Sequence, residues 1–108
     1  MKELSVITQQ YADRTVITAA GEIDLTTCPA LRRATHVLPL RGRTLQMDLS
    51  GVTFMDSSGL NLMLQLRKRL IAEGGQIAVT GLQPRVEYVL RLTETYELLT
   101  TAAVSKAA

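Results

Sequence analysis

A strand–helix–strand succession between residues 45 and 80 constrains the fold more than any other feature of this sequence. Residues 45–49 and 76–80 are short apolar segments typical of strands, and residues 58–73 between them carry apolar side chains at helical spacing. The glycine pair at 74–75 ends the helical pattern. Strands joined through a helix need a crossover connection, so we expect these two strands to be parallel members of one sheet.

The N-terminal part adds an antiparallel pair. Residues 4–9 alternate in side-chain direction, residues 15–20 are rich in β-branched side chains, and the turn at 12–14 between them is typical of a hairpin. A helix is expected from Cys28 to about Val37, because Pro29 suits a first helical turn. The sheet is therefore expected to be mixed.

The remaining segments complete an order of ββαβαβα with an optional final strand. We expect a loop or short extended segment at 50–55, a helix at 85–92 and a short last strand at 98–100. After Thr101 we expect a short helix or a frayed tail.

This order predicts a single α/β domain over residues 1–108, with a core at about 4–100 and a short tail at 101–108. Its sheet would be mixed, with four to five strands and with helices mainly on one face. Hydrophobic residues make up 46% of the chain, enough for a core, and aromatic residues only 4%, so that core must be aliphatic.

Several functional classes need residues that this sequence does not supply. A net charge of +2 without a basic stripe or stacking aromatics argues against nucleic-acid binding. Cys28 and His36, the sole cysteine and histidine, cannot build a closed nitrogen–sulfur metal site. No apolar stretch reaches the ~20 residues of a membrane span. The lone cysteine and the absence of a leader fit a reducing cytoplasm.

Catalysis is not expected either. A hydrolase needs a nucleophile beside a base, but His36 lies about 20 residues upstream of Ser57 at the end of a predicted helix. The sequence contains neither a Gly-x-Ser-x-Gly elbow nor a Gly-x-x-x-x-Gly-Lys phosphate loop. We therefore predict neither catalysis nor a bound cofactor.

The most informative segment runs from Met47 to Leu60, from a strand into a helix. Asp56, Ser57 and Ser58 are all good helix caps. A phosphate on Ser57 or Ser58 would be tolerated at the positive end of the helix and would repel a partner docked there. The residues alone do not choose between the two serines, and an ordinary serine-rich cap explains them as well.

The run from Asp48 to Leu60, with its Phe-Met-Asp-Ser-Ser-Gly-Leu core, resembles the signature of bacterial STAS domains of the anti-sigma factor antagonist family. The segment at 21–24, Gly-Glu-Ile-Asp, is similar to that family's second landmark, and the glycine pair at 74–75 with the following strand to its third. The resemblance extends from about Leu4 to Leu99.

The resemblance implies a phosphorylation-controlled partner switch. The unmodified protein would bind an anti-sigma factor that is also a serine kinase of the GHKL type, and so release a sigma factor. The kinase would phosphorylate Ser57 rather than Ser58, with Ser58 serving as a cap. Binding would then end until a PP2C-type phosphatase restored it. The protein would act as a monomer or weak dimer.

The same resemblance implies a partner-binding surface, formed by Gly21, Glu22, Ile23, Asp24, Asp56, Ser57, Ser58, Gly59, Leu60 and Asn61. Asn61 stands where the family usually has glycine, and residues 92–96 lack the usual Thr-Gly-Leu turn. The alternative function is that of a STAS adaptor without a sigma factor, in a sensory scaffold or a lipid-transport complex.

Overall fold

The computed structural model describes the backbone of residues 3–105 and the side chains of residues 3–100. Strands and helices alternate after an initial pair of strands. In chain order they are β1 (Leu4–Gln10), β2 (Arg14–Ile23), α1 (Cys28–His36), β3 (Thr44–Met55), α2 (Ser57–Ala72), β4 (Gln76–Thr80), α3 (Pro84–Leu92) and α4 (Tyr96–Ser105).

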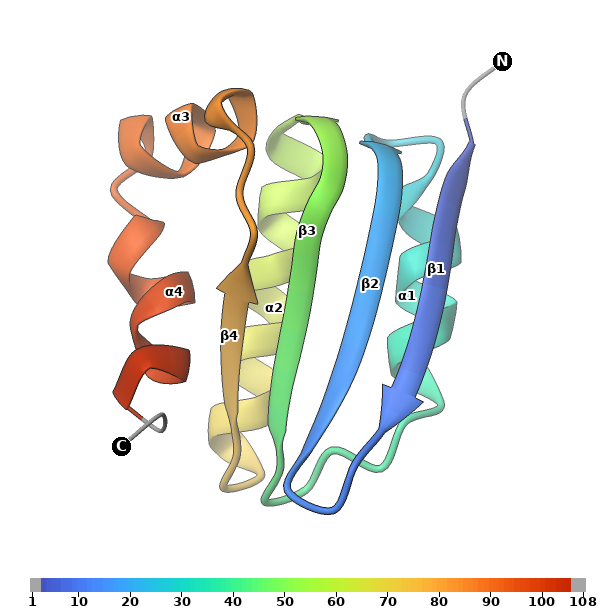
Figure 1. Ribbon diagram of the computed structural model, residues 1–108, viewed down its shortest axis with the longest axis vertical. Coiled ribbons are helices and arrows are strands. Elements are labelled where there is room, and N and C mark those ends of the chain that lie inside the picture. Colours follow the sequence, from blue (N-terminus) through green and yellow to red (C-terminus); the bar gives the residue numbers. More distant parts are fainter. Residues whose placement is uncertain (1–2, 106–108) are drawn as a thin grey trace.

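The four strands form one mixed sheet in the order β1-β2-β3-β4. Strands β1 and β2 are antiparallel, whereas β2, β3 and β4 are parallel to one another. Helices α1 and α2 pack behind the sheet, α3 crosses its end, and α4 lies beside β4 (Figure 1). The expected α/β class and the mixed sheet covered mainly on one face are confirmed.

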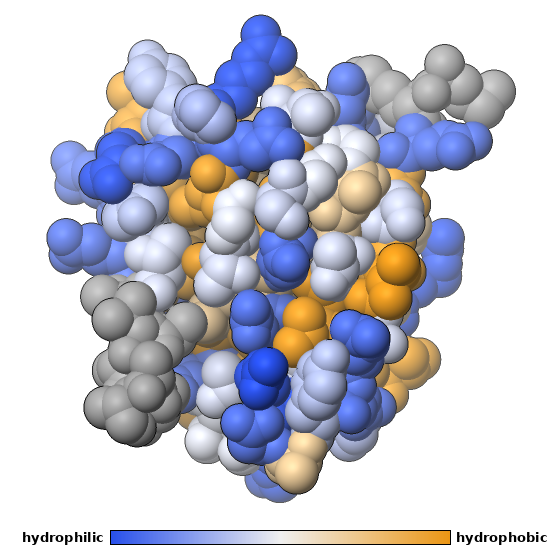
Figure 2. Space-filling model, viewed as in Figure 1, coloured by the Kyte–Doolittle hydropathy of each residue, from blue (hydrophilic) through white to orange (hydrophobic). Residues whose placement is uncertain are grey.

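Alternating side chains of the strands and one side of α2 make an aliphatic core between the sheet and the helices. Its fully buried members include Ile17, Leu45, Met47, Leu49, Met63 and Leu70. On the open face, Arg14 donates to Gln46 and Gln46 to Thr80. Figure 2 shows hydrophilic side chains spread over this face, with smaller apolar areas between them.

Strand β3 is longer than the sequence pattern predicts. The segment at 50–55, expected as a loop or short extended stretch, continues the strand to Met55. It pairs with the last part of β2 across two register shifts. Gly51 permits this pairing, because a Cβ there would lie 2.8 Å from the Cβ of Ala20. The extension brings the chain to the end of the sheet where α2 begins.

The prediction of a last strand at 98–100 is wrong, because these residues lie inside helix α4. Leu99 is fully buried and its amide donates to the Thr95 carbonyl at 3.2 Å, whereas Leu98 is 46% exposed. A short apolar run fits a strand or one turn of helix equally well, and here packing beside β4 selects the helix. The described residues 3–105 therefore contain four strands.

Helices α2 and α3 end in the same kind of turn. The amides of Gly74 and Gly75 donate to carbonyls of the last turn of α2, and those of Glu94 and Thr95 donate in the same way to α3. Both patterns are Schellman motifs, which place the residue after the cap in the left-handed region. Gly74 has φ 81°, and Glu94 has φ 61° without being glycine. The end of α3 thus has the Schellman geometry although residues 92–96 lack the usual Thr-Gly-Leu sequence.

Candidate functional site

Asp56 joins strand β3 to helix α2 and caps that helix. Its backbone is extended, and its carboxylate accepts hydrogen bonds from the amides of Ser58 at 2.9 Å and Gly59 at 3.3 Å. The Ser58 hydroxyl donates to the same oxygen at 2.6 Å. The cap satisfies amides that have no partner within the helix. The expectation that Ser58 is the cap is wrong, since Ser58 is instead a donor to the capping residue.

The end of strand β2 lies beside this cap. Ile23 pairs with Met55, and the Asp56 amide donates to the Ile23 carbonyl at 3.2 Å. Gly59 allows the close approach, because a Cβ there would lie 2.7 Å from a methyl group of Ile23 and 2.6 Å from Met55 Cγ. The two segments with family-like sequences therefore meet at one end of the sheet, where β2 and β3 finish.

Asp24 organises the turn between β2 and α1. Its carboxylate accepts from the Thr26 amide at 3.0 Å, the Thr26 hydroxyl at 2.7 Å and the Thr27 amide at 3.1 Å. The Thr27 hydroxyl donates to the Glu22 carbonyl at 2.8 Å. Asp24 and Thr27 are buried, while Leu25 between them is 75% exposed. Hydrogen bonds within the turn thus fix its conformation, and the Leu25 side chain points outward.

The two serines of the junction differ in surroundings. Ser57 occupies the first position of α2 and is exposed. Its hydroxyl makes no hydrogen bond with residues 3–105, in contrast to the Ser58 hydroxyl on Asp56. Ser58 is partly buried and also lies 3.9 Å from the Cys28 sulfur. The Ser57 hydroxyl is therefore open to another molecule, and that of Ser58 is used inside the cap.

Two exposed side chains of the junction, Asn61 and Leu25, come from different elements. Asn61 lies one helical turn further along α2 and is exposed, so it shares a face with Ser57. Leu25 projects from the neighbouring turn. Sequence reasoning missed Leu25. The only signal was a large apolar residue within an otherwise polar turn, which does not tell an exposed side chain from a buried one.

Four residues of the predicted partner-binding surface are buried, namely Ile23, Asp24, Gly59 and Leu60. They cannot offer much surface to a partner, because their side chains or Cα atoms face the core or the turn. Their structural role is to hold the exposed residues in place. The remaining six members are exposed or partly buried, namely Gly21, Glu22, Asp56, Ser57, Ser58 and Asn61.

His36, the one histidine of the chain, does not lie beside Ser57. Cys28, the first residue of α1, lies near Ser58, whereas His36 is the last residue of that helix. Eight residues along a helix span about 12 Å, so the imidazole is far from the Ser57 hydroxyl.

Among the described residues, no group of three or more histidine, cysteine or acidic side chains could hold a metal ion. Within residues 3–105, none of the helices combines the length and apolar character needed to cross a membrane.

The mixed sheet, the one-sided helices and the serine-bearing helix start define an α/β domain of the STAS type. The STAS domain family matches residues 5–108, and the chain belongs to this family. The resemblance seen in the sequence is therefore confirmed.

Relatives and solved structures agree with this assignment. The chain is 27% identical over 103 residues to the anti-sigma-B factor antagonist of Bacillus subtilis, covering 95% of this chain and 94% of the relative. It is 32% identical over 88 residues to that of Listeria monocytogenes, covering 81% and 77%.

Among solved structures, an anti-sigma factor antagonist from Mycobacterium paratuberculosis has a TM-score of 0.79 at 26% identity, with 90% of this chain and 83% of that chain covered. The antagonist SpoIIAA in its unphosphorylated form has a TM-score of 0.77 at 20% identity, covering 95% and 96%. The second likeness concerns the fold alone.

Proposed function

We propose that this chain is an anti-sigma factor antagonist that acts in the cytoplasm as a binding protein and is switched by phosphorylation of Ser57. The unmodified form would bind an anti-sigma factor serine kinase of the GHKL type and release the sigma factor. A PP2C-type phosphatase would return the modified form to the binding state. The single observation that carries the proposal is the exposed Ser57 hydroxyl, which makes no hydrogen bond with the described residues, beside the Asp56 cap.

The cap explains how a phosphate could be added without unfolding the helix. The Asp56 carboxylate is held by Ser58 and Gly59, so Ser57 contributes no side-chain bond to the cap. A phosphate brings a charge of about −1.5 to −2 and lies at the positive end of α2, where an anion is favourable. The folded state would therefore accept the modification.

The same phosphate would weaken partner binding. It would stand next to the carboxylate of Asp56, and a partner docked over this edge would meet two neighbouring anions. Leu25 and Asn61 would complete the docking surface of the unmodified protein, with Leu25 as its apolar anchor. The switch would thus act by charge at a preformed surface and would need no change of fold.

The test is phosphate transfer from ATP by an anti-sigma factor kinase of the same organism, with the modified residue mapped by mass spectrometry. We expect one phosphate on Ser57, loss of transfer in Ser57→Ala, and retention in Ser58→Ala. Transfer to Ser58 would contradict the proposal. Absence of transfer from every such kinase would favour the adaptor function instead.

Binding supplies the second readout of the same proposal. By calorimetry, Ser57→Asp should bind the kinase at least about tenfold more weakly, because like charges at an interface cost several kcal/mol. Ser57→Ala should still bind. The thermal midpoint of Ser57→Asp should stay equal or rise slightly, since an acid at a helix start stabilises by about 0.3–1 kcal/mol. A large loss of stability would make the serine a structural residue.

A further inference from the structure

A second surface of the molecule, remote from Ser57, combines an apolar floor with a cation that has no hydrogen-bond or ion-pair partner among the described residues. It is the pocket between α2 and α4 over strand β4, here called the α2–α4 pocket, with a volume of about 710 Å³. Ligand sites commonly measure about 300–1,000 Å³. The lining residues that matter are Arg67, Ile71, Ile77, Glu94, Glu97 and Leu98.

Arg67 differs from the other arginines in comparable surroundings. Four arginines are partly buried. Arg14 donates to Gln46 at 3.2 Å, Arg43 donates to the Thr15 hydroxyl at 3.0 Å, and Arg69 donates to a backbone carbonyl at 3.0 Å. The guanidinium of Arg67 makes no hydrogen bond or ion pair with the described residues. A partly desolvated guanidinium with five donors favours an anionic acceptor.

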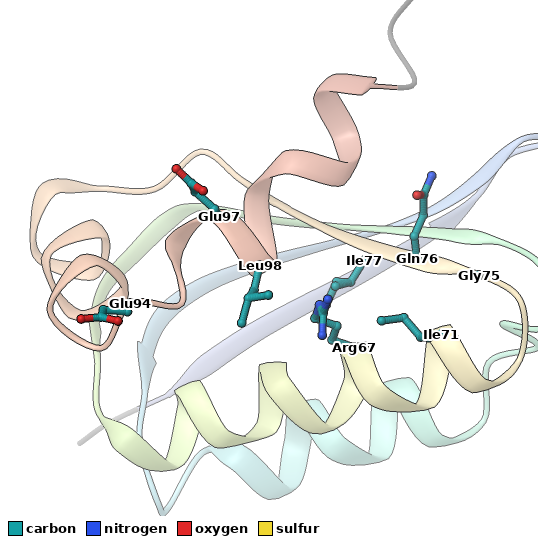
Figure 3. Close-up of a pocket in the computed structure, with 8 residues that line it drawn as sticks. All are labelled: Arg67, Ile71, Gly75, Gln76, Ile77, Glu94, Glu97 and Leu98. Carbon is teal, nitrogen blue, oxygen red and sulfur yellow. The ribbon is translucent and has the colours of Figure 1, made fainter.

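The apolar part of the pocket is also incompletely covered. Ile77 of β4 forms a buried floor, whereas Ile71 is 51% exposed and Leu98 is 46% exposed. Figure 3 shows the side chains of Arg67, Ile71 and Leu98 directed into the space between the two helices. A ligand that covered Ile71 and Leu98 would remove apolar surface from water while its charged group reached Arg67.

The rim limits the charge of the ligand. Glu94 and Glu97 carry negative charges at the border of the pocket, both on exposed side chains. Among the described lining residues Arg67 is the one cation beside these two carboxylates, and Glu97 also interacts electrostatically with Arg91. Phosphates and other polyanions are disfavoured next to the two carboxylates. A ligand with a single carboxylate and an apolar body would pair with Arg67 and cover the apolar floor. It would also bring only one negative charge near the glutamates of the rim.

We propose that the α2–α4 pocket is a binding site for a small amphipathic monocarboxylate, with the carboxylate on Arg67 and the hydrocarbon body on Ile71, Ile77 and Leu98. The pocket is independent of the partner switch, because Arg67 lies ten residues after Ser57, about 15 Å along the axis of α2. The same carboxylate chemistry occurs in a short fatty acid and in an apolar amino acid, and Glu94 on the rim would additionally attract the ammonium group of the amino acid.

The test is a titration of the full ¹⁵N-labelled chain, followed by NMR and calorimetry, with octanoate and leucine as separate probes. Either probe should give saturable shifts of the Ile71, Ile77 and Leu98 amides, and the tighter one identifies the source of the carboxylate. Octylamine, octanol and inorganic phosphate are the controls. Binding of any control as tight as that of the better carboxylate, or failure of both carboxylates to saturate at millimolar concentration, would overturn the assignment.

Variants separate the role of the cation from general surface charge. Arg67→Met should weaken the better carboxylate about tenfold or more, since a hydrogen bond to a charged group is lost. Lys68→Met removes the neighbouring exposed cation and should leave the affinity unchanged. Equal losses in both variants would refute the site. The urea midpoint of Arg67→Met should equal that of the parent chain, and a clear drop would show that Arg67 has a structural partner instead.

Discussion

At the scale of single residues, neighbouring side chains at the junction between β3 and α2 have different roles. Ser58 is committed to the Asp56 cap by a 2.6 Å hydrogen bond, whereas Ser57 faces solvent. Two adjacent serines at a helix start look alike in a sequence, because either can serve as a cap. The difference arises from the helical rotation of about 100° between them, which directs one hydroxyl toward the turn and the other outward.

We expect the exposed Leu25 side chain to contribute to binding of the partner. Leu25→Ala should weaken binding of the anti-sigma factor partner about tenfold, because burying a leucine at an interface contributes about 1.5–3 kcal/mol. Stability should not fall, since the side chain is 75% exposed in the free protein. Isothermal calorimetry with the partner and a thermal melt measure the two quantities.

A matched control for this variant is another leucine with a similarly exposed side chain. Leu92→Ala removes a leucine that is 68% exposed at the end of α3. It should leave partner binding unchanged. Equal weakening by both substitutions would mean that Leu25 has no special place in the interface.

At the scale of secondary-structure elements, the ends of α2 and α3 form a natural comparison. The turn geometry is the same, but α2 uses Gly74 in the left-handed region and α3 uses Glu94. A side chain in this region costs about 1–2 kcal/mol compared with right-handed backbone, and glycine avoids that cost.

We therefore expect Glu94→Gly to raise the free energy of unfolding by about 1 kcal/mol, partly offset by the greater freedom of glycine in the unfolded chain. Urea denaturation followed by circular dichroism measures this quantity. Glu94→Ala removes the carboxylate but keeps Cβ, so it should change stability little. If alanine stabilises as much as glycine, the carboxylate and not the backbone is the source of the effect.

Most elements could be predicted from periodicity, and the failures have local causes. The helix at 58–73 and the strand at 76–80 were predicted within one residue, because their patterns are long or clearly bounded. Residues 50–55 mix polar and apolar side chains with a glycine, and pairing with the bulged end of β2 makes them a strand. Residues 98–100 form too short an apolar run to show its period.

The candidate site likewise has features that could be predicted from the sequence and features that could not. Its members were predicted by likeness to family landmarks, and the structure brings Ile23 and Asp56 together through one hydrogen bond. The burial of Gly59 and Leu60 and the exposure of Leu25 could not be predicted, because each depends on contacts between segments far apart in the chain. Asp56 was one of three candidate caps, and the local geometry of the helix start selects it.

At the scale of the whole molecule, one side chain links the two helices that carry the site. Arg69, in the last part of α2, donates to the carbonyls of Thr35 and Leu38 at 3.0 Å each, at the C-terminal end of α1. These carbonyls lie where a cation is favourable. The contact fixes α1 against α2 at the end opposite to the Asp56 cap.

Arg69→Met should therefore lower the free energy of unfolding by about 1.5–3 kcal/mol, the usual value for hydrogen bonds to a charged group. Lys68→Met, one residue away and exposed, should have little effect. Chemical denaturation of both variants tests this. A similar loss in each would assign the effect to net charge and not to the bonds.

The separation between a committed serine and an uncommitted one also bears on how such proteins diversify. Substitutions at Ser57, Asn61 or Leu25 change exposed atoms, while Asp24, Asp56 and Gly59 hold the framework through bonds and close packing. After gene duplication, one copy can therefore acquire a new interaction specificity through a few exposed positions without first losing the ability to fold. If the proposed function holds, a family built on this junction can keep related partner switches separate from each other through few substitutions.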